Sequence, residues 1–361
     1  MKKNSQYPDR SKGVGQKTAG PAGRPCSRLT GQDPVPGPLS LYVHVPFCIR
    51  KCPYCDFFSV SDLSLVPAYV AGVCNEIRLW SRMAGGWSSV PVHTVYFGGG
   101  TPSLLTRDQA GQILDAIRQS FCLTAAPEMT VEVNPGTVDS HYLEGLRHLG
   151  INRLSIGAQS FDPEKLGVLS RIHTRNQVKD TLAGAARAGF TNLGLDLMYG
   201  LPGETAAVWQ KDLDTALEYR PAHLSCYMLT LEPGTPFFDR YEAGSLCPCD
   251  TDRRMDFFVH TSRVLENAGY IHYEVSNFAR GGNLRSIHNT HYWNRGAYLG
   301  VGPSAHSFLP GGPVGRPGPG SVSRACPGLP SGSAGDFGPV RSWNAADIHA
   351  WLDHLAAGRL P

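Results

Sequence analysis

The sequence predicts an α/β fold in which six strand-and-helix units form a partial, TIM-like barrel within residues 39–309. Short apolar segments typical of strands alternate along this region with longer segments whose apolar residues recur at helical spacing. Such alternation favours a parallel sheet covered by helices. Six units in succession fit a partial barrel better than a flat, doubly wound sheet, so we expect the (βα)6 arrangement.

The expected strands are short apolar runs, and helical segments lie between them. The first helical stripe spans residues 66–80 and has Pro67 near its start, where proline suits a helix. Residues 106–109 form a capping box that begins the second helix. A later stripe at 205–219 places apolar side chains on one face. The six strands are expected at residues 41–45, 94–97, 129–133, 153–156, 193–197 and 224–227.

Three regions outside the expected barrel differ from it in composition. Residues 1–38 hold seven Lys and Arg against two Asp, with few large apolar residues, so we expect a disordered basic tail. Residues 310–340 are rich in Gly, Pro and Ser, which predicts a flexible linker or insertion. A helical pattern resumes at residues 343–360, so we expect 341–361 to begin a C-terminal helical region.

Composition also narrows the partners and the compartment. The net charge of +3 comes from the tail, because the rest of the chain holds 26 basic and 28 acidic residues. We therefore expect no nucleic-acid partner, with a tail that touches nucleic acid or acidic lipid as the alternative. Neither a run of eighteen apolar residues nor an apolar signal region is present, so we expect no transmembrane segment. Ten cysteines in a chain of this length fit the reducing cytoplasm.

Three closely spaced cysteines, Cys48, Cys52 and Cys55, follow the first expected strand. Three thiolates at this spacing can bind three irons of a cubic 4Fe–4S cluster and leave the fourth iron open to a ligand. Zinc is an alternative, but a zinc site commonly needs four ligands, and Cys247 and Cys249 are distant and wrongly spaced. A purely structural role for these cysteines is the other alternative.

Polar residues and glycines fall at the ends of successive expected strands. In a parallel barrel the carboxyl ends of the strands lie at one face, where reactive groups gather. Glycines 98–100 would let the backbone approach a ligand closely, or they would only shape a tight turn. Glu132, Gln159 and Asp196 end or follow the third, fourth and fifth strands. Each of these three could instead only bond a loop backbone.

These motifs together resemble the radical S-adenosylmethionine (SAM) enzymes. The cysteine spacing and the strand that ends in Gly-Gly-Gly-Thr-Pro carry this resemblance, which covers residues 39–309. Further motifs are similar to the branch related to oxygen-independent coproporphyrinogen III oxidase, and especially to its heme-chaperone members. They lie at residues 96–103, 131–136, 152–161, 195–203, 273–279 and 288–293.

The resemblance implies a role for each matching residue. Cys48, Cys52 and Cys55 would hold the 4Fe–4S cluster, whose open iron would take the amino and carboxylate groups of SAM. An electron from the cluster would then release methionine and a 5′-deoxyadenosyl radical. The positions that contact this SAM are matched by Tyr42, Gly99 and Glu132. The positions that contact a second SAM in the oxidase are matched by Tyr54, Gly100, Thr101, Gln159, Arg171 and Asp196.

Two features favour the heme chaperones over the oxidase within this resemblance. The oxidase has a fourth cysteine two residues after the third, where this chain has Phe57. Residues 288–293 match a motif associated with heme in the chaperones, and His288 is its candidate heme ligand. A buried, hydrogen-bonded histidine is the alternative for that position.

The resemblance therefore implies heme as cargo and apo-hemoproteins, such as respiratory enzymes, as its recipients. An electron donor such as flavodoxin or ferredoxin is expected as a further partner. Oxidative decarboxylation of coproporphyrinogen III is the alternative function. The heme chaperones usually continue into a small helical domain, so we expect residues 341–361 to be a truncated C-terminal region.

Overall fold

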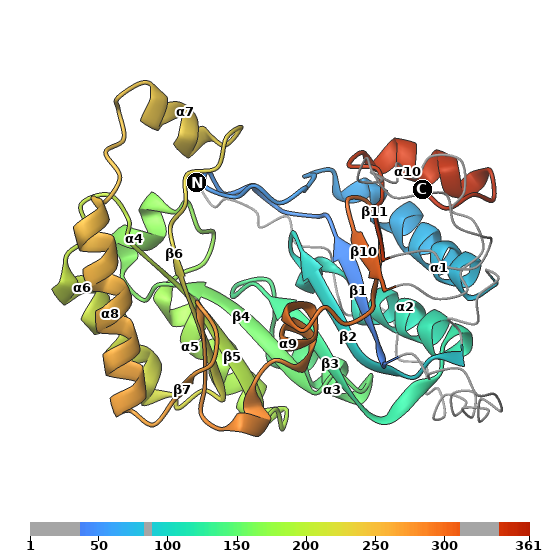
Figure 1. Ribbon diagram of the computed structural model, residues 1–361, viewed down its shortest axis with the longest axis horizontal. Coiled ribbons are helices and arrows are strands. Elements are labelled where there is room, and N and C mark those ends of the chain that lie inside the picture. The colour runs from blue at the N-terminus through green and yellow to red at the C-terminus, as the bar shows by residue number, and fades with distance from the viewer. Residues whose placement is uncertain (1–36, 83–88, 311–338) are drawn as a thin grey trace, which may run out of the picture.

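Six parallel strands, adjacent in chain order, form the centre of a curved sheet (Figure 1). The computed structural model describes residues 37–82, 89–310 and 339–361. Each strand pairs in parallel with the next along the chain, which confirms the predicted partial (βα)6 barrel. The strands are β1 (Leu39–Val45), β2 (Val92–Gly99), β3 (Leu123–Val133), β4 (Arg153–Gln159), β5 (Asn192–Tyr199) and β6 (His223–Met228).

Five shorter strands extend the sheet on both sides. On one side, β9 (Tyr298–Val301) pairs in parallel with β1, and β10 (His306–Leu309) and β11 (Val340–Trp343) follow in antiparallel order. On the other side, β8 (Asn277–Ala279) pairs antiparallel with β6, and β7 (Ile271–His272) lies beyond it. The strand order runs from β11 to β7 without closing on itself, so the barrel is open.

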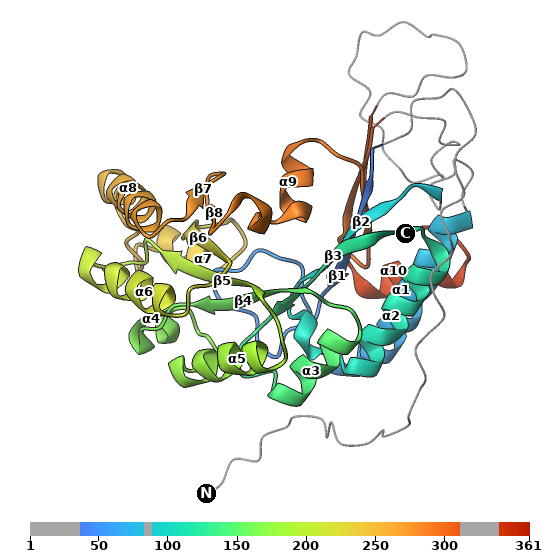
Figure 2. The same ribbon diagram turned by 90° about the horizontal axis from the view of Figure 1, so that it is seen from below.

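Helices cover the outer face of the strands, and one short helix lies on the opposite side. Figure 2 shows α2, α3, α5 and α6 along the outside of the curved sheet, with α9 across the strands from them. Short 3-10 turns among the described residues connect other elements at Leu63–Leu65, Pro102–Leu104 and Gly282–Leu284. The α-helices are α1 (Val66–Arg82), α2 (Arg107–Ser120), α3 (Ser140–His148), α4 (Pro163–Val168), α5 (Arg175–Arg187), α6 (Ala206–Glu218), α7 (Pro236–Glu242), α8 (Thr251–Asn267), α9 (Ile287–Trp293) and α10 (Ile348–Ala356).

The predicted capping box is present at the start of α2. The Thr106 Oγ1 accepts a hydrogen bond from the Gln109 backbone N–H at 3.2 Å, and Gln109 Oε1 accepts one from the Thr106 N–H at 2.9 Å. These two bonds satisfy N–H groups that have no partner within the helix. Thr174 and Gln177 repeat the arrangement at the start of α5.

The two faces of the central strands differ in chemistry. Residues that point outward, such as Leu41, Leu154 and Ile156, join the hydrophobic core beneath the helices. Residues that alternate with them point inward and are largely polar, among them Tyr96 and Glu132. The barrel interior is therefore lined by polar side chains, which suits a site for ligands better than a packed core.

The C-terminal prediction was wrong in part. A helix was expected from residue 343, whereas Trp343 ends strand β11, which pairs with His306 of β10. The helix begins at Ile348, because the side chain of Asp347 accepts a hydrogen bond from the Ala350 N–H and caps it. Pairing with β10 outweighs the helical pattern of the preceding residues, a tertiary effect that local spacing does not reveal.

The other predictions for the terminal and linker regions fall mostly outside the described residues. This holds for the disordered tail at 1–38 and for the linker at 310–340, of which the structure describes the ends at 37–38, 310 and 339–340. None of the described helices combines the length and apolar character needed to cross a bilayer.

Candidate cluster and SAM site

The three predicted cluster cysteines lie together in the loop that follows β1. Cys48, Cys52 and Cys55 are free thiols of intermediate burial. Burial raises the pKa of Cys55, and the neighbouring Cys52 and Cys48 raise it further, so the three sulfurs are close enough to repel one another as thiolates. A positively charged iron cluster would relieve this repulsion and favour the thiolate forms.

Backbone and side-chain contacts hold the loop on the end of β1. The Cys48 N–H donates to the Val60 carbonyl at 3.0 Å, and the Cys55 N–H donates to the Cys52 carbonyl at 3.1 Å. His44, near the end of β1, shares a hydrogen bond through Nε2 with the Phe58 carbonyl at 2.9 Å. The loop is therefore attached near both of its ends, which fixes the positions of the thiols before any cofactor binds.

Two side chains donate hydrogen bonds to the cysteine sulfurs. Thr101 Oγ1 donates to Cys48 Sγ at 3.6 Å, and Arg171 Nη1 donates to Cys52 Sγ at 3.4 Å. Among the described residues, no three His, Cys, Asp or Glu side chains are close enough to hold one metal ion. Ligands of a cubic cluster each bind a different iron, so three separated thiols with donors beside them fit that group.

Glycines 99 and 100 pack tightly against the cluster loop. At Gly99 the φ angle is +109°, and a Cβ atom would lie 2.7 Å from the His44 ring. A Cβ at Gly100 would lie 2.8 Å from the Phe47 carbonyl oxygen. The fold thus needs both glycines for its own packing. A Gly99→Val change would strain the backbone in addition to any effect on SAM.

The residues matched to the first SAM meet at the inner surface of β1, β2 and β3. Glu132 accepts hydrogen bonds from the Gly99 N–H at 3.2 Å and from the Tyr96 hydroxyl at 2.9 Å. Burial raises the pKa of Glu132 to about 7, and the nearby Asp196 raises it as well. Tyr42 lies beside this carboxylate, because a Cβ atom at Gly98 would lie 3.0 Å from both Glu132 Oε1 and Tyr42 Cε2. The structure therefore brings Tyr42, Gly99 and Glu132 together.

Most residues matched to the second SAM gather around Arg171. Its guanidinium donates to the Tyr54 hydroxyl at 3.5 Å and to the Gly157 carbonyl at 3.1 Å. A Cβ at Gly157 would lie 3.2 Å from Gln159 Nε2 and 3.5 Å from Arg171 Nη2, so Gln159 is a neighbour of Arg171. Arg171 also lowers the pKa of Asp196, although burial dominates and raises it. Gly100 and Thr101 lie beside Phe47 and Cys48.

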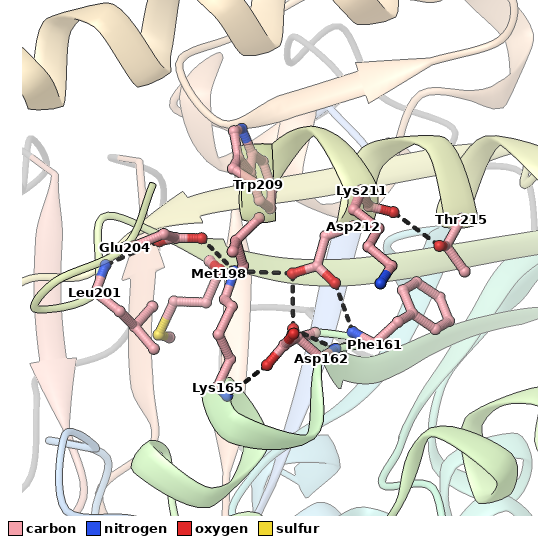
Figure 3. Close-up of polar contacts among 12 residues, drawn as sticks. Phe161, Asp162, Lys165, Met198, Leu201, Glu204, Trp209, Lys211, Asp212 and Thr215 are labelled. Atoms are coloured by element: carbon pink, nitrogen blue, oxygen red, sulfur yellow. Dashed lines mark hydrogen bonds and ion pairs between the residues drawn. The ribbon is translucent and has the colours of Figure 1, made fainter. Parts of the chain in front are cut away.

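A buried ion-pair network anchors the loops after β4 and β5 (Figure 3). Lys165 Nζ contacts carboxylate oxygens of Glu204 at 2.5 Å and Asp212 at 2.8 Å. Asp212 also accepts from the Ser160 hydroxyl and the Phe161 N–H, in the loop just past Gln159. Gln159 itself has a φ of 63°, which is unusual for a residue other than glycine. The network therefore holds this strained strand end in place.

His288 lies on α9, on the side of the strands that faces the barrel interior. Its Nδ1 is 2.7 Å from Thr94 Oγ1, and its Nε2 is 2.7 Å from the Tyr292 hydroxyl. The side chain is 1% exposed, and the Tyr96 ring stacks on it at 4.9 Å between centroids. Burial lowers the pKa of His288 well below its usual value, so the imidazole is neutral.

Comparison with known proteins matches this architecture. Residues 42–216 fit the family described as the radical SAM superfamily. The chain is 40% identical to a heme chaperone HemW from Synechocystis over 78% of this chain and 68% of the relative. It is 41% identical to HemW from Escherichia coli, covering 74% of this chain and 70% of that one. The chain belongs to the HemW-like family of radical SAM proteins.

Two further relatives extend the comparison. A mouse protein named radical S-adenosyl methionine domain-containing protein 1, mitochondrial, is 39% identical over 81% of this chain and 67% of its own length. The solved structure of coproporphyrinogen III oxidase (HemN) from Escherichia coli superposes with a TM-score of 0.66 at 26% identity. That match covers 75% of this chain, which spans 65% of the HemN chain.

The HemW-like site contains residues that spacing alone did not single out. Asn134 accepts from Arg171 Nη2 at 2.9 Å and shares a hydrogen bond with His173 Nδ1 at 3.1 Å, so it orients Arg171. The sequence feature that could have identified Asn134 is its position in the motif at residues 131–136. Arg153, the first residue of β4, points into the barrel; it lies in the motif at residues 152–161, but the motif alone does not separate it from an ordinary strand-end arginine.

Proposed function

We propose that this HemW-like protein binds a 4Fe–4S cluster, SAM and heme, and that it delivers heme to apo-hemoproteins such as respiratory enzymes. The observation that carries the proposal is the position of Tyr96. Its ring stacks on His288, in the heme-associated segment, and its hydroxyl donates to Glu132, in the group matched to SAM. One residue thus connects the two candidate sites directly. The names of the HemW relatives support the same function.

The residues of the chain have separate tasks in this proposal. Cys48, Cys52 and Cys55 would hold the cluster, while Arg171 and Thr101 would stabilise the charge on its sulfur ligands. The cluster and SAM together would supply one-electron chemistry when they are bound. Glu132 would lie beside the positively charged SAM, which favours the ionised carboxylate over the neutral form. A cytoplasmic location and an electron donor such as flavodoxin or ferredoxin complete the proposal.

Heme would bind at α9 through His288. Ligation of heme iron needs a neutral imidazole nitrogen, and the low pKa of His288 keeps the ring neutral. Its Nε2 shares a hydrogen bond with Tyr292, so iron would replace that bond and the helix would have to open locally. Trp293 is 65% exposed and Ile287 is 46% exposed on the same helix, and they offer apolar surface to a porphyrin.

A second candidate function is oxidative decarboxylation of coproporphyrinogen III. The similarity to HemN favours it, since the TM-score is 0.66 over three quarters of this chain. Against it stands Phe57, at the position where the oxidase resemblance calls for a further cysteine. Phe57 is 65% exposed, so its side chain does not occupy a buried position in the cysteine loop.

Titration with heme under anaerobic conditions tests the proposed function. The wild-type protein should bind heme with a shifted Soret band, and His288→Ala should weaken this binding at least about tenfold because it removes the iron ligand. His291→Ala is the matched control: it lies on the same helix, but its Nε2 bonds the Ala297 carbonyl, and we expect near wild-type binding.

Three results would count against parts of the proposal. Unchanged heme binding by His288→Ala would remove His288 as the ligand. A wild-type protein that does not bind heme would reject the chaperone function. Sustained conversion of coproporphyrinogen III to protoporphyrinogen IX by the reconstituted protein would instead establish the oxidase activity.

A further inference from the structure

Arg153 is a buried cation on the inner surface of the barrel that forms no ion pair with another described residue. The residue is 1% exposed, and its Nε and Nη1 have no hydrogen-bond partner among the described residues. It lies on the same strand face as Ser155, whose hydroxyl donates to Asp196, so its side chain points into the barrel. No carboxylate of a described residue lies within the 4.0 Å that defines an ion pair with it.

The nearby carboxylates are committed to other groups. Glu128, the acid that acts most strongly on Arg153, accepts hydrogen bonds from the Ile287 and His288 N–H groups at 3.2 and 3.0 Å. It therefore caps α9. Glu132 accepts from Tyr96 and the backbone of β2, and Asp196 accepts from serine hydroxyls. Burying the N–H groups of a guanidinium without hydrogen bonds is costly unless a ligand supplies the missing acceptors.

Other polar atoms around Arg153 also lack partners within the described part of the chain. Thr130, which is opposite Arg153 in the β3–β4 register, has an unpaired buried Oγ1. His223 uses Nε2 on the Tyr273 hydroxyl at 2.7 Å and leaves Nδ1 unpaired. A Cβ at Gly194 would lie 3.6 Å from both Arg153 Nη2 and His223 Nδ1, so the absent side chain leaves space between these two groups. Polar atoms without hydrogen-bond partners among the described residues thus converge on one region of the barrel interior.

We propose that Arg153 is the receptor for a carboxylate of the bound porphyrin, that is, for a heme propionate. A guanidinium recognises a carboxylate through charge-assisted hydrogen bonds, and Arg153 keeps unpaired N–H donors on both Nε and Nη1. The location is suitable, because Thr130 lies opposite Arg153 on one side and opposite Tyr96 on the other, and the Tyr96 ring stacks on His288. This inference rests on the proposed function and adds to it the chemical group that anchors the cargo.

The test compares hemin with hemin dimethyl ester, in which both propionates are esterified. The wild-type protein should bind hemin about tenfold to a hundredfold more tightly than the ester, as one charged hydrogen-bonded pair implies. Arg153→Gln should bind both porphyrins equally, at the wild-type affinity for the ester. Arg153→Lys keeps the charge without the planar fork and should recover part of the preference. Arg118→Gln, on the outer helix α2, is the matched control and should behave as wild type.

The outcomes separate this inference from the proposed function. If the wild-type protein binds both porphyrins equally well, no propionate is recognised and the inference fails while heme binding stands. If Arg153→Gln keeps the full preference for hemin, Arg153 is not the receptor. Binding of neither porphyrin would overturn the proposed function and the inference with it. The comparison on wild-type protein decides the question even where a variant does not fold, which cluster absorbance and thermal unfolding would reveal.

Discussion

The cysteines of the described chain fall into groups that differ in their surroundings. Cys48, Cys52 and Cys55 are half-buried, close together and contacted by hydrogen-bond donors. Cys226 is buried, and burial raises its pKa far above the ordinary value, so it stays a thiol. Cys247 is exposed and bonds only its neighbour's carbonyl. The environment, rather than the number of cysteines, therefore identifies the candidate cluster ligands.

At this scale we predict that Cys52→Ser abolishes the iron–sulfur absorbance after anaerobic reconstitution. Serine replaces a soft thiolate with a hydroxyl that binds iron poorly, and two thiolates are too few to hold the cubic cluster. Iron and sulfide should be quantified on the same sample as the absorbance. Cys247→Ser, which changes an exposed cysteine outside the loop, should reconstitute like wild type. Full absorbance in the Cys52→Ser protein would show that the cluster has other ligands.

Site residues could be identified from the sequence where their residue type and spacing indicate their chemistry. The three cysteines and Glu132 could be chosen because their residue types and strand-end positions are themselves the signal. Arg153 could not, because its significance is a lack of partners, which depends on side chains from β3, β5 and β6. His288 is an intermediate case. The motif marks the residue, but its burial and its bonds to Thr94 and Tyr292 appear only in three dimensions.

At the scale of elements, all six predicted central strands are present and are longer than their apolar runs. The expected segment at 94–97 lies within β2, which spans Val92–Gly99, and the segment at 129–133 lies within β3, which begins at Leu123. The strands extend further because pairing with the neighbouring strand continues beyond the apolar runs, as between Val92 and Leu123. Apolar pattern therefore located each strand but underestimated its length.

At the scale of secondary-structure elements, the testable prediction concerns the stability of the loops after β4 and β5. Replacing Lys165 with Met should lower the free energy of unfolding by about 3–5 kcal/mol, because two carboxylates, Glu204 and Asp212, would be left buried without a cation. Chemical denaturation monitored by circular dichroism would measure the loss. SAM affinity should fall as well, since the same network holds the loop next to Gln159.

Lys211→Met is the control for this change. Lys211 is an exposed lysine on the same helix as Asp212, so its replacement removes equal charge without breaking the buried network. We expect a change within about 0.5 kcal/mol, as for most surface substitutions. Equal stability of the Lys165→Met and wild-type proteins would mean that the network is not needed to hold these loops.

At the scale of the whole molecule, the C-terminal segment is tied to the first helix of the barrel. Glu76 of α1 accepts hydrogen bonds from the Gly302 N–H, from Asn344 Nδ2 and from Trp351 Nε1. Burial raises the pKa of Glu76 to about 7. The Trp351 ring contacts Tyr69, whose hydroxyl donates to the His44 carbonyl at 2.7 Å, just before the cluster loop. Residues far apart in the sequence thus support the cluster loop.

Replacing Trp351 with Ala should therefore destabilise the protein by about 3–5 kcal/mol, through a large cavity and the loss of a donor to Glu76. Thermal and chemical unfolding would measure the effect. Trp343→Ala serves as the matched control, because Trp343 belongs to the same C-terminal region but is 57% exposed. A similar small loss for both variants would contradict a supporting role for α10.

The junction between β10 and β11 sets how freely this protein can change in length. Leu309 lies opposite Val340 in the antiparallel register, so the chain leaves the sheet and returns to it at neighbouring points. The entropic cost of joining two fixed points rises only slowly with the number of residues between them. The pairing of β10 with β11 should therefore tolerate a change in the number of residues between Leu309 and Val340 at a small entropic cost.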